Sequence, residues 1–586
     1  MCGIIGAIGK KVSSLPNLEK SIEALALRGP DDHGTEKLSQ GIFGHTRLSI
    51  VDLSSGGHQP MKDLEHKNTI VFNGEIYNYK EVRVELEKKG HIFTSHSDTE
   101  VILKAYSEYK EKCVEYLDGQ FAFAIWDEGA KKLFLARDRF GEKPLYISNQ
   151  SDTFIFASEL KALFASGLVT PELDTTSLDN YLALLYVPPW RSIYKNVFQL
   201  KPAHYATWQN GSYREHRYWR LTKEASAFSF TGAAEELRAL LTESVRSRMV
   251  ADVEVGAFLS GGMDSSIVVR LAQQLTDKKL KTFSAGFEDI INELPYAHEI
   301  ASLADTDHTE VAVHENLASA FLNTVSYFDE PFGDSSNIPT GIISKLARKK
   351  VKVALSGDGG DELFWGYGQY THFNHLPKIK KLLNTLSGAN AFTYYKNSIL
   401  THFSPMERRL LMLDPSAVEE DITTYLDLSE ASTPLEKINL TDFYLGLPGD
   451  MLTKVDRASM MYSLEVRAPF LNPHLAQFAY NLPPAFKTDG RKGKIIFEKA
   501  FGDLLPQDFF TRKKQGFGAP VLVWLKKAEF KKLIDEWFTD QAKMGAYIDM
   551  RVVRTYVDKF YLGDTTLQYR LWNLLALEAW FRTRLI

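Results

Sequence analysis

The pattern of strands and helices changes once along the 586-residue chain, and this change constrains the fold more than any other feature. Residues 1–215 hold short β-rich runs broken by Gly, Asn and Asp, such as 120–138, and this spacing predicts packed antiparallel sheets. Beyond about residue 225, helical stretches such as 233–249 alternate with short apolar strands, as in a parallel sheet with crossover helices. The carboxyl-terminal part is mostly helical. We therefore predict two units, residues 1–215 and 225–586.

Composition excludes several classes of protein. The chain has 69 Lys and Arg against 74 Asp and Glu, a net charge of -5, so it has no bulk positive field for nucleic acid. No apolar stretch approaches the ~20 residues of a membrane-spanning helix, and no basic region precedes the apolar run at the start, as in an export signal. The two cysteines, Cys2 and Cys113, cannot form a disulfide framework. We expect a cytoplasmic protein with small-molecule substrates, no nucleic-acid partner and no membrane contact.

Cys2 is a candidate nucleophile because it follows Met1. A small second residue normally permits removal of the initiator, which leaves Cys2 with a free α-amino group. An α-amine of pKa about 7.7 to 8.0 can accept the proton of a thiol of pKa about 8.5, so one residue supplies both nucleophile and base. The alternative is that Cys2 is an incidental terminal residue. Cys113 matches no motif and is expected to be structural.

Four segments of the first half carry polar residues inside or at the ends of apolar runs: RGPDDHG (28–34), TRLSIVD (46–52), FNGEIYN (72–78) and SDTE (97–100). Each has an ordinary structural interpretation. The Asn-Gly pair favours a two-residue hairpin turn. SDTE has the form of a helix capping box. The arginine of TRLSIVD, taken alone, is of the kind usually found at the surface or in a salt bridge.

Together, these segments and the Cys-Gly start resemble the glutaminase domain of the class II amidotransferases. The resemblance implies an α+β sandwich with αββα layers, the fold of the amino-terminal-nucleophile hydrolases. It implies that Arg47 binds the α-carboxylate of glutamine, for which a planar guanidinium is suited, and that Asp98 and Glu75 bind the α-ammonium group. Asn73 and the Gly74 amide form the oxyanion hole, a donor pair suited to acyl transfer from a carboxamide. The other implied glutamine contacts are Leu48, Ser49, Ile50 and Val51.

The second half contains a Gly- and Ser-rich loop, SGGMDSS (260–266), between an apolar strand and an amphipathic helix. Free N–H groups and hydroxyls at the start of a helix point at one spot, where the helix dipole favours an anion. The chain has no GxxxxGK[ST] motif. The alternative is a loop that merely connects strand and helix. The phosphate-site residues expected here are Ser260, Gly261, Gly262, Asp264, Ser265 and Ser266.

A second apolar strand runs into SGDGGDE (356–362). Loops that follow parallel strands emerge together at the carboxyl edge of the sheet, where ligands bind. Three carboxylates in one loop repel one another unless they share a cation. This suggests Mg²⁺ at Asp361.

SGGMDSS resembles the pyrophosphate loop of the ATP pyrophosphatases, which cleave ATP between the α and β phosphates. Over nearly the whole chain, the order Cys-Gly, SGGMDSS, GDGGDE and VDRASM resembles the glutamine-dependent asparagine synthetases of the B type. The segments SLEVRAPFLN (463–472), GRKGK (490–494) and KKQGFG (513–518) continue that resemblance. It implies an α/β parallel-sheet ATP-pyrophosphatase domain with a helical carboxyl-terminal part.

The resemblance implies a reaction at two sites. Cys2 releases ammonia from glutamine through a γ-glutamyl thioester, and the ammonia passes through an internal tunnel to a β-aspartyl-adenylate made from ATP and aspartate. The implied products are asparagine, glutamate, AMP and pyrophosphate. Asp264 and Asp361 hold Mg²⁺, and Lys494 stabilises the anionic intermediate, although a lysine in a basic run is usually just solvated. A homodimer is plausible for the family, but no residue here requires one. The implied ATP contacts also include Leu259, Ala285, Ser356 and Gly357.

One position departs from the family pattern. The B-type enzymes have Glu where this chain has Asp358, at the position implicated in forming the acyl-adenylate and accepting the proton of the amine. Asp is one methylene shorter, so the acceptor can sit differently. Chains with a GDGGDE-like loop also resemble amidotransferases that convert sugar uronic acids to uronamides, which is the alternative function. A third hypothesis is a non-catalytic protein that keeps the fold for binding, but the intact Cys2, Arg47 and Asp264 argue against it.

Overall fold

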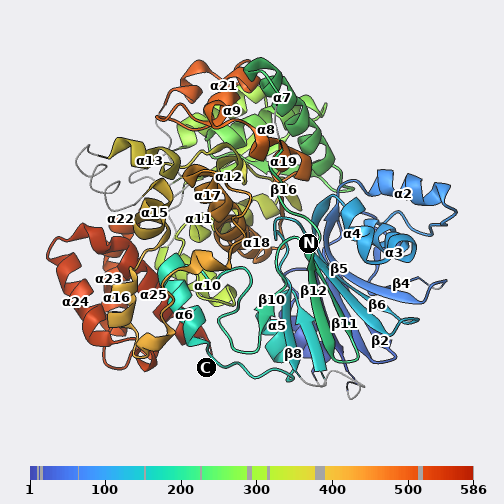
Figure 1. Cartoon of the computed structure of the whole chain (residues 1–586), viewed down its shortest axis with the longest axis horizontal. Helices are drawn as coiled ribbons and strands as arrows, with labels where there is room; N and C mark the ends of the chain where they lie inside the picture. Colours follow the sequence, from blue (N-terminus) through green and yellow to red (C-terminus); the bar gives the residue numbers. More distant parts are fainter. Residues whose placement is uncertain are drawn as a thin grey trace.

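The protein folds around three β-sheets, two stacked in the first half of the chain and one in the second (Figure 1). The structure, a computed structural model, describes residues 1–9, 12, 17–63, 65–150, 153–224, 227–286, 293–312, 317–376, 390–512 and 519–584. The segment KKQGFG (513–518) lies outside these residues. Within them, no helix has both the length and the apolar character needed to cross a membrane.

The stacked sheets are each six-stranded and antiparallel. The first has the order β10 (Phe198–Gln199), β8 (Tyr146–Gln150), β9 (Thr153–Ala157), β1 (Gly3–Ile8), β3 (Gly41–Arg47) and β2 (Asp32–Leu38). The second has the order β12 (Ser212–Arg217), β11 (His204–Gln209), β7 (Lys132–Arg137), β6 (Gly119–Asp127), β5 (Asn68–Ile76) and β4 (Met61–Asp63). The helices that cover them are α1 (Leu18–Ala24) and α5 (Leu160–Ala165) on the first sheet, and α2 (Tyr79–Lys88), α3 (Asp98–Tyr109) and α4 (Cys113–Tyr116) on the second.

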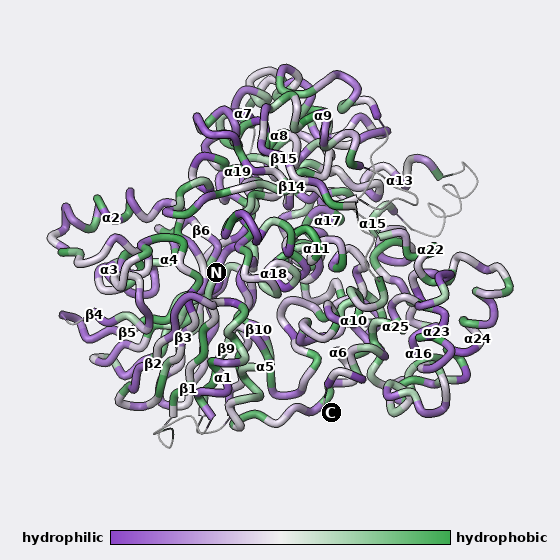
Figure 2. The backbone as a smooth tube through the Cα atoms, turned by 180° about the vertical axis from the view of Figure 1, so that it is seen from behind, coloured by the Kyte–Doolittle hydropathy of each residue, from purple (hydrophilic) through white to green (hydrophobic). Residues whose placement is uncertain are grey.

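Alternation along the strands produces four layers. Successive side chains of a strand point to opposite faces. In β6, Ala124 packs with Ile4 of β1 between the two sheets, whereas the neighbouring Phe123 packs with the helices. On the other side of β1, Ile5 packs with Leu160 of α5. Figure 2 shows the same order from behind, with α2, α3 and α4 on one side of the sheets and α5 on the other. The predicted αββα sandwich is confirmed.

The third sheet is five-stranded and parallel, in the order β15 (Asp307–Ala312), β14 (Lys281–Gly286), β13 (Val255–Phe258), β16 (Val353–Leu355) and β17 (Glu465–Arg467). Chain order reverses between β13 and β16, so the loops after these two strands open side by side at the carboxyl edge, where such sheets bind ligands. This confirms the predicted α/β unit. Its helices are α7 (Phe230–Arg248), α8 (Met263–Gln274), α9 (Leu294–Ala304), α10 (Leu317–Tyr327) and α11 (Asn337–Arg348).

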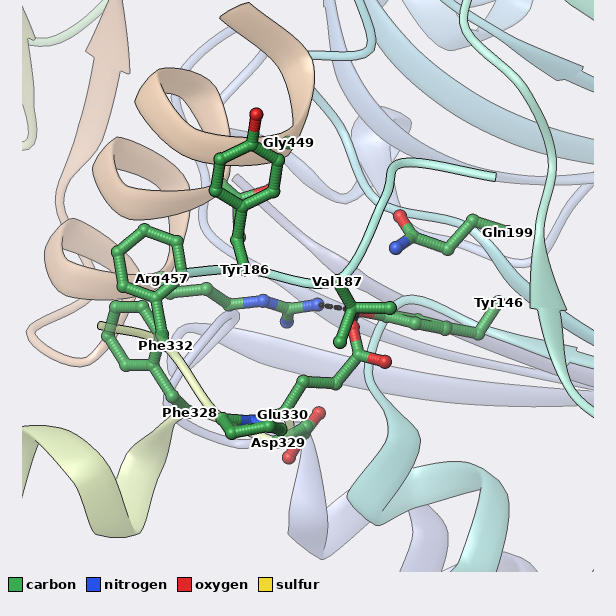
Figure 3. Close-up of a pocket in the computed structure, with 12 residues that line it drawn as sticks. Tyr146, Tyr186, Val187, Gln199, Phe328, Asp329, Glu330, Phe332, Gly449 and Arg457 are labelled. Atoms are coloured by element: carbon green, nitrogen blue, oxygen red, sulfur yellow. Dashed lines mark hydrogen bonds between the residues drawn. The ribbon is translucent and has the colours of Figure 1, made fainter. Parts of the chain in front are cut away.

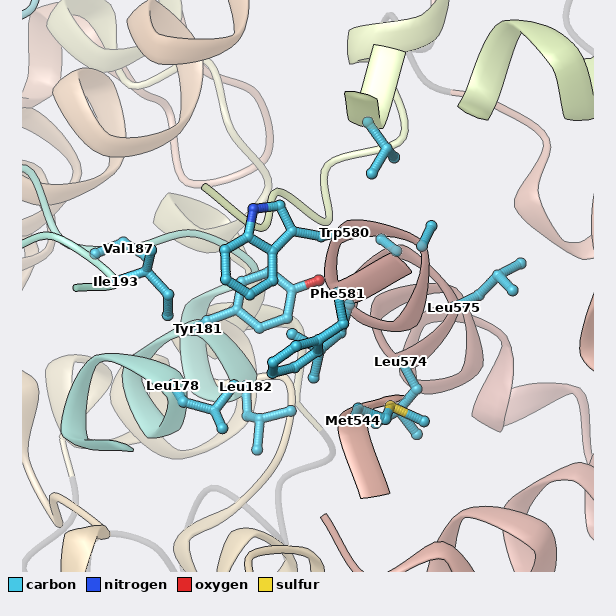
Figure 4. Close-up of a cluster of buried hydrophobic side chains, with 14 of the residues drawn as sticks. Leu178, Tyr181, Leu182, Val187, Ile193, Met544, Leu574, Leu575, Trp580 and Phe581 are labelled. Carbon is cyan, nitrogen blue, oxygen red and sulfur yellow. The ribbon is translucent and has the colours of Figure 1, made fainter. Parts of the chain in front are cut away.

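The carboxyl-terminal part is helical, as predicted, and takes in one helix from the first half. That helix is α6 (Thr175–Leu184), which packs on α25 (Gln568–Thr583) (Figure 4). The Tyr181 hydroxyl donates to the Asn573 carbonyl at 2.9 Å. The other α-helices here are α12 (Gly360–Phe364), α13 (Gln369–His375), α15 (Ala391–Tyr395), α16 (Pro405–Leu411), α17 (Pro434–Thr441), α18 (Thr453–Met460), α19 (Pro473–Asn481), α20 (Pro484–Lys487), α21 (Ile495–Phe501), α22 (Val521–Lys526), α23 (Ala528–Trp537) and α24 (Met550–Tyr561).

Candidate active sites

Cys2 is buried at the start of β1, with its backbone held on both sides. Its N–H donates to Asn73 Oδ1 at 3.0 Å, and its carbonyl accepts from Arg28 Nε at 3.0 Å. Burial raises the pKa of the Cys2 thiol, while the amino-terminal charge, the Leu48 amide and the Arg47 guanidinium oppose that rise. Because the raised pKa disfavours the thiolate, a base beside the thiol would help to remove its proton.

Asn73 and Gly74 lie within β5, opposite Ala122 and Phe121 of β6, and do not form the hairpin turn that the Asn-Gly pair alone favours. A Cβ at Gly74 would lie 2.1 Å from the Gln120 carbonyl oxygen, so the close strand pairing requires glycine. Asn73 is fully buried, and its Nδ2 has no hydrogen-bond partner among the described residues. A buried amide donor left free beside Cys2 is what an oxyanion site needs.

Arg47 is not a surface residue, since it is 6% exposed at the end of β3. Its guanidinium donates to the Ser54 carbonyl at 3.0 Å and the Val51 carbonyl at 3.3 Å, and also to the Asp52 carbonyl. A Cβ at Gly57 would lie 1.8 Å from Arg47 Nη2, so only glycine leaves room for this side chain.

The segment that follows Arg47 packs against the other half of the molecule. The side chains of Leu48, Ile50 and Val51 pack with Val353 of β16, in the other half of the molecule. Ser49 N–H donates to Asp31 Oδ2 at 2.8 Å. The apolar side chains of this segment are therefore part of the junction between the two halves, and only its backbone is left for a ligand.

Asp98 and Glu75 lie close together, and both are buried. Asp98 Oδ2 accepts from the Ile76 N–H at 3.0 Å. Burial and the charge of Glu465 raise the pKa of Asp98 to about 6 and hold the pKa of Glu75 well above its usual range. The capping box is wrong: Ser97 accepts from Thr99 N at 3.1 Å, but the carboxylate of Glu100, the fourth residue of SDTE, turns to the N–H groups of the preceding residues 94 and 95 instead.

Two residues of β17 also belong to this site. Glu465 Oε2 lies 3.2 Å from the α-ammonium group of Met1. Arg467 Nε donates to Glu465 Oε1 at 2.6 Å, and Arg467 Nη2 lies 3.5 Å from Glu75 Oε2. Both residues lie in the motif SLEVRAPFLN, but the sequence alone predicted no function for them. Only the pairing of β17 with β16 brings them within reach of residues about 390 positions earlier.

The SGGMDSS loop forms as the pattern indicates, between β13 and the start of α8. Ser260 Oγ accepts from the Gly262 N–H at 3.2 Å and lies 3.0 Å from Ser265 Oγ. Gly261 has a φ of +77°, which an L side chain rarely adopts. The buried Ser266 hydroxyl has no partner among the described residues. Leu259 is fully buried in the core, so its backbone alone faces the loop, and Ala285 is half-buried on the neighbouring β14.

The loop after β16 lies directly against the first. A Cβ at Gly357 would lie 2.8 Å from Ser265 N, and one at Gly360 would lie 2.6 Å from Asp264 Oδ1. These glycines let the two backbones touch. The structure thus brings together residues that lie about 90 positions apart in the sequence.

Lys494 lies between the two carboxylates expected to hold metal. Its Nζ is 2.7 Å from Asp264 Oδ1 and 2.5 Å from Asp264 Oδ2, and it also pairs with Asp361. Lys494 is 6% exposed, and although burial opposes it, the two carboxylates raise its pKa above the usual range. The interpretation as a solvated surface charge does not hold for this lysine. Two convergent carboxylates are hard oxygen ligands that also fit Mg²⁺.

Asp358 lines a small cavity at the junction of the two halves, about the size of one water molecule. Burial raises its pKa, while the Ser356 hydroxyl and the charge of Lys454 oppose the rise. Lys454 of α18 donates to Asp334 Oδ2 at 3.1 Å. Glu142 of the first half lines the same cavity, together with Ser356, Leu452, Val455 and Asp456.

A sandwich with a buried amino-terminal cysteine, joined to a parallel sheet with a phosphate loop, defines the class of glutamine-dependent amidotransferases. The Asparagine synthase family matches residues 236–582, and the Glutamine amidotransferase domain matches residues 1–219. The chain belongs to the asparagine synthase family. It is a ligase of this type, which performs glutamine-dependent amidation.

Three named proteins match nearly the whole chain. The chain is 32% identical to Asparagine synthetase [glutamine-hydrolyzing] 1 of Bacillus subtilis, over 99% of this chain and 96% of the relative. It is also 32% identical to a putative asparagine synthetase [glutamine-hydrolyzing] of Mycobacterium tuberculosis, over 99% and 97% of the two chains. Amidase chry2 of Gibberella zeae is 25% identical over 95% of each chain.

Proposed function

We propose that the protein makes asparagine from aspartate, glutamine and ATP, with AMP and pyrophosphate as products. One observation carries the choice of acceptor. Beside Asp358 lie a buried cation, Lys454, and the carboxylate of Asp334, 3.1 Å apart. A cation and an anion side by side match the α-carboxylate and α-ammonium groups of an amino acid, whereas a uronic acid has no ammonium group to meet the anion.

At the first site, the roles follow from the contacts around Cys2. The freed α-amine takes the thiol proton, and the thiolate attacks the carboxamide carbon of glutamine. Asn73 Nδ2 and the Gly74 N–H stabilise the oxyanion. The amine returns the proton to the leaving ammonia, and water then hydrolyses the γ-glutamyl thioester to glutamate. Arg47 orients the α-carboxylate, and Asp98 and Glu75 orient the α-ammonium group.

At the second site, the N–H groups and hydroxyls of 260–266 hold the phosphates of ATP, with backbone contacts from Leu259, Ala285, Ser356 and Gly357. Asp264 and Asp361 would hold Mg²⁺, which neutralises phosphate charge. Lys494 then exchanges its carboxylate partners for the anionic intermediate. The aspartate β-carboxylate attacks the α phosphorus, and pyrophosphate leaves.

Ammonia then attacks the acyl-adenylate, and AMP leaves. Asp358 accepts the proton of the attacking amine, for which its raised pKa is suited. Glu142 of the first half lines the small cavity beside Asp358, so the proposed internal passage of ammonia would reach the second site from this side.

We also propose the division into a glutaminase unit, 1–215, and a synthetase unit, 225–586. The last strand of the sandwich, β12, ends at Arg217, two residues past the first boundary, and the first strand of the parallel sheet begins at Val255.

The test is AMP release in the presence of glutamine, with aspartate or a nucleotide-linked uronic acid as the acceptor. Stimulation by aspartate alone is expected. Stimulation by the uronic acid alone would favour uronamide synthesis, and release of ADP would overturn the pyrophosphatase chemistry. An Asp358→Glu variant is a matched control that lengthens this side chain by one methylene and keeps its charge. It should retain aspartate as its acceptor.

A further inference from the structure

A cluster of buried charges lies directly behind Cys2, at the junction of the two halves. Arg28, in the turn before β2, donates from Nε to the Cys2 carbonyl. Its Nη1 and Nη2 donate to the two oxygens of Asp456, on α18 of the second half, at 2.8 and 3.0 Å. Nη1 also donates to Glu159 Oε1 at 3.1 Å. A two-point pair of this kind fixes the plane of the guanidinium as well as its position.

α18 contributes a second arginine to the same cluster. Arg457 Nη1 donates to Glu159 Oε1 at 2.8 Å, and Nη2 donates to the Tyr146 hydroxyl at 3.3 Å (Figure 3). Next to Glu159, the Ser158 hydroxyl accepts from the Ile4 N–H at 3.0 Å. The start of β1 is therefore held by groups whose own placement depends on α18.

The position of the Cys2 thiol depends on these backbone contacts. The Cys2 N–H is tied to Asn73 and its carbonyl to Arg28, so the two bonds fix the backbone that carries the thiol. Misplacement of a reacting group by about 1 Å can cost about 100-fold in rate. Arg28 has no contact with Asn73 or Arg47 among the hydrogen bonds of the described residues, so its contribution to the site is made through Cys2.

We propose that Asp456 positions Cys2 for glutamine hydrolysis, by fixing the Arg28 guanidinium that holds the Cys2 carbonyl. The synthetase half thus supplies a positioning residue to the glutaminase site. Because α18 also carries Lys454 toward Asp334, one helix contacts both sites. The inference rests on the proposed role of Cys2 as the nucleophile.

The test measures glutamate release and ammonia-dependent AMP release by the full-length Asp456→Asn variant, which keeps the side-chain shape and removes the charge. The kcat for glutamate release should fall about 10- to 100-fold, with the KM for glutamine within about twofold. Because Asp456 also lines the cavity beside Asp358, ammonia-dependent AMP release is the reference: it should fall by at most about threefold, much less than glutamate release, which also shows that the chain is folded. Asp456→Glu keeps the charge and should lose less glutaminase activity than Asp456→Asn.

Asp179→Asn is a matched control. Asp179 pairs with Arg408 Nε at 2.6 Å, and both side chains are buried where α6 meets α16, away from Cys2. Its glutaminase activity should be unchanged. Equal effects of the two Asn variants, an Asp456→Glu variant no better than Asp456→Asn, or equal loss of both activities would overturn the proposal. A Cys2→Ala variant that still releases glutamate would instead overturn the proposed role of Cys2, so the two failures are distinguishable.

Discussion

The two sites differ in how their polar groups are paired. Around Cys2, the positions are set by strand backbone, and the Asn73 amide keeps a donor free. At the carboxyl edge of the parallel sheet, Lys494 already neutralises Asp264 and Asp361. In the proposed function, the oxyanion donor of Asn73 is in place before glutamine binds, whereas Lys494 would have to leave its two carboxylates when ATP and metal bind.

This difference has an energetic basis. A buried neutral donor left unpaired costs about 1–3 kcal/mol, which a fold can tolerate. Two half-buried carboxylates side by side repel each other, and Lys494 offsets this repulsion. The oxyanion donor is therefore free before substrate binds, whereas the two carboxylates are held by an internal cation.

The largest expected effect separates the two sites completely. Cys2→Ala should abolish glutamine-dependent AMP release while ammonia-dependent release survives, because only the first site needs the thiol. Both are measured with the same AMP assay. Cys113→Ala, which removes a fully buried thiol under α3, is the control and should keep both activities. Loss of both activities in Cys2→Ala would contradict the separation.

Asp264→Asn should have the reverse effect. It removes one of the two charges that Lys494 now neutralises and that would hold Mg²⁺, so AMP release from ATP should fall to background with either nitrogen source. Glutamate release from glutamine should remain within about twofold of the parent, since Asp264 lies at the start of α8, at the carboxyl edge of the parallel sheet. A variant that still forms AMP would show that this carboxylate is not needed for ATP cleavage.

Asn73→Ala tests the free donor. Removal of one oxyanion donor typically lowers kcat by about 100- to 1000-fold, and the same loss is expected here for glutamate release. Ammonia-dependent AMP release is the internal control. A change in the KM for glutamine with an unchanged kcat would mean that Asn73 binds the ground state and not the oxyanion.

The smallest effect is a dependence on pH. Burial raises the pKa of Asp98 to about 6, so the carboxylate is charged above that pH and protonated below it. The α-ammonium group of glutamine needs the charged form, and the KM for glutamine should therefore rise about tenfold per pH unit below 6. Asp98→Asn should bind glutamine weakly at every pH and lose this slope. A slope that persists in the variant would assign the titration to another group, with Glu75 the nearest candidate.

The sequence pattern predicts the antiparallel sheets and the loops at 260–266 and 356–362 because their signals are local, whereas the αββα layers are implied by the family resemblance. Strand alternation and the Gly-Ser loop each occupy a few consecutive residues. Asn73-Gly74 shows the limit of this reasoning: the pair alone indicates a hairpin turn, and only its place opposite Ala122 and Phe121 makes it part of a strand.

Long-range pairs could not be predicted. Lys494 lies in a basic run that suggests a solvent-exposed face, and its contact with Asp264 joins residues 230 positions apart. Arg28 and Asp456 are 428 positions apart. Each residue is visible in a motif, but which carboxylate meets which cation depends on how the two halves dock.

The residues of β17 bear on how such enzymes can be recombined. Arg467, paired with Glu465, reaches Glu75 from the opposite half of the chain. A chimaera that takes its first 215 residues from one relative and the remainder from another must carry matching side chains at these positions. The interface between the two halves therefore limits how they can be recombined. The side chains on both of its sides must be taken from the same relative.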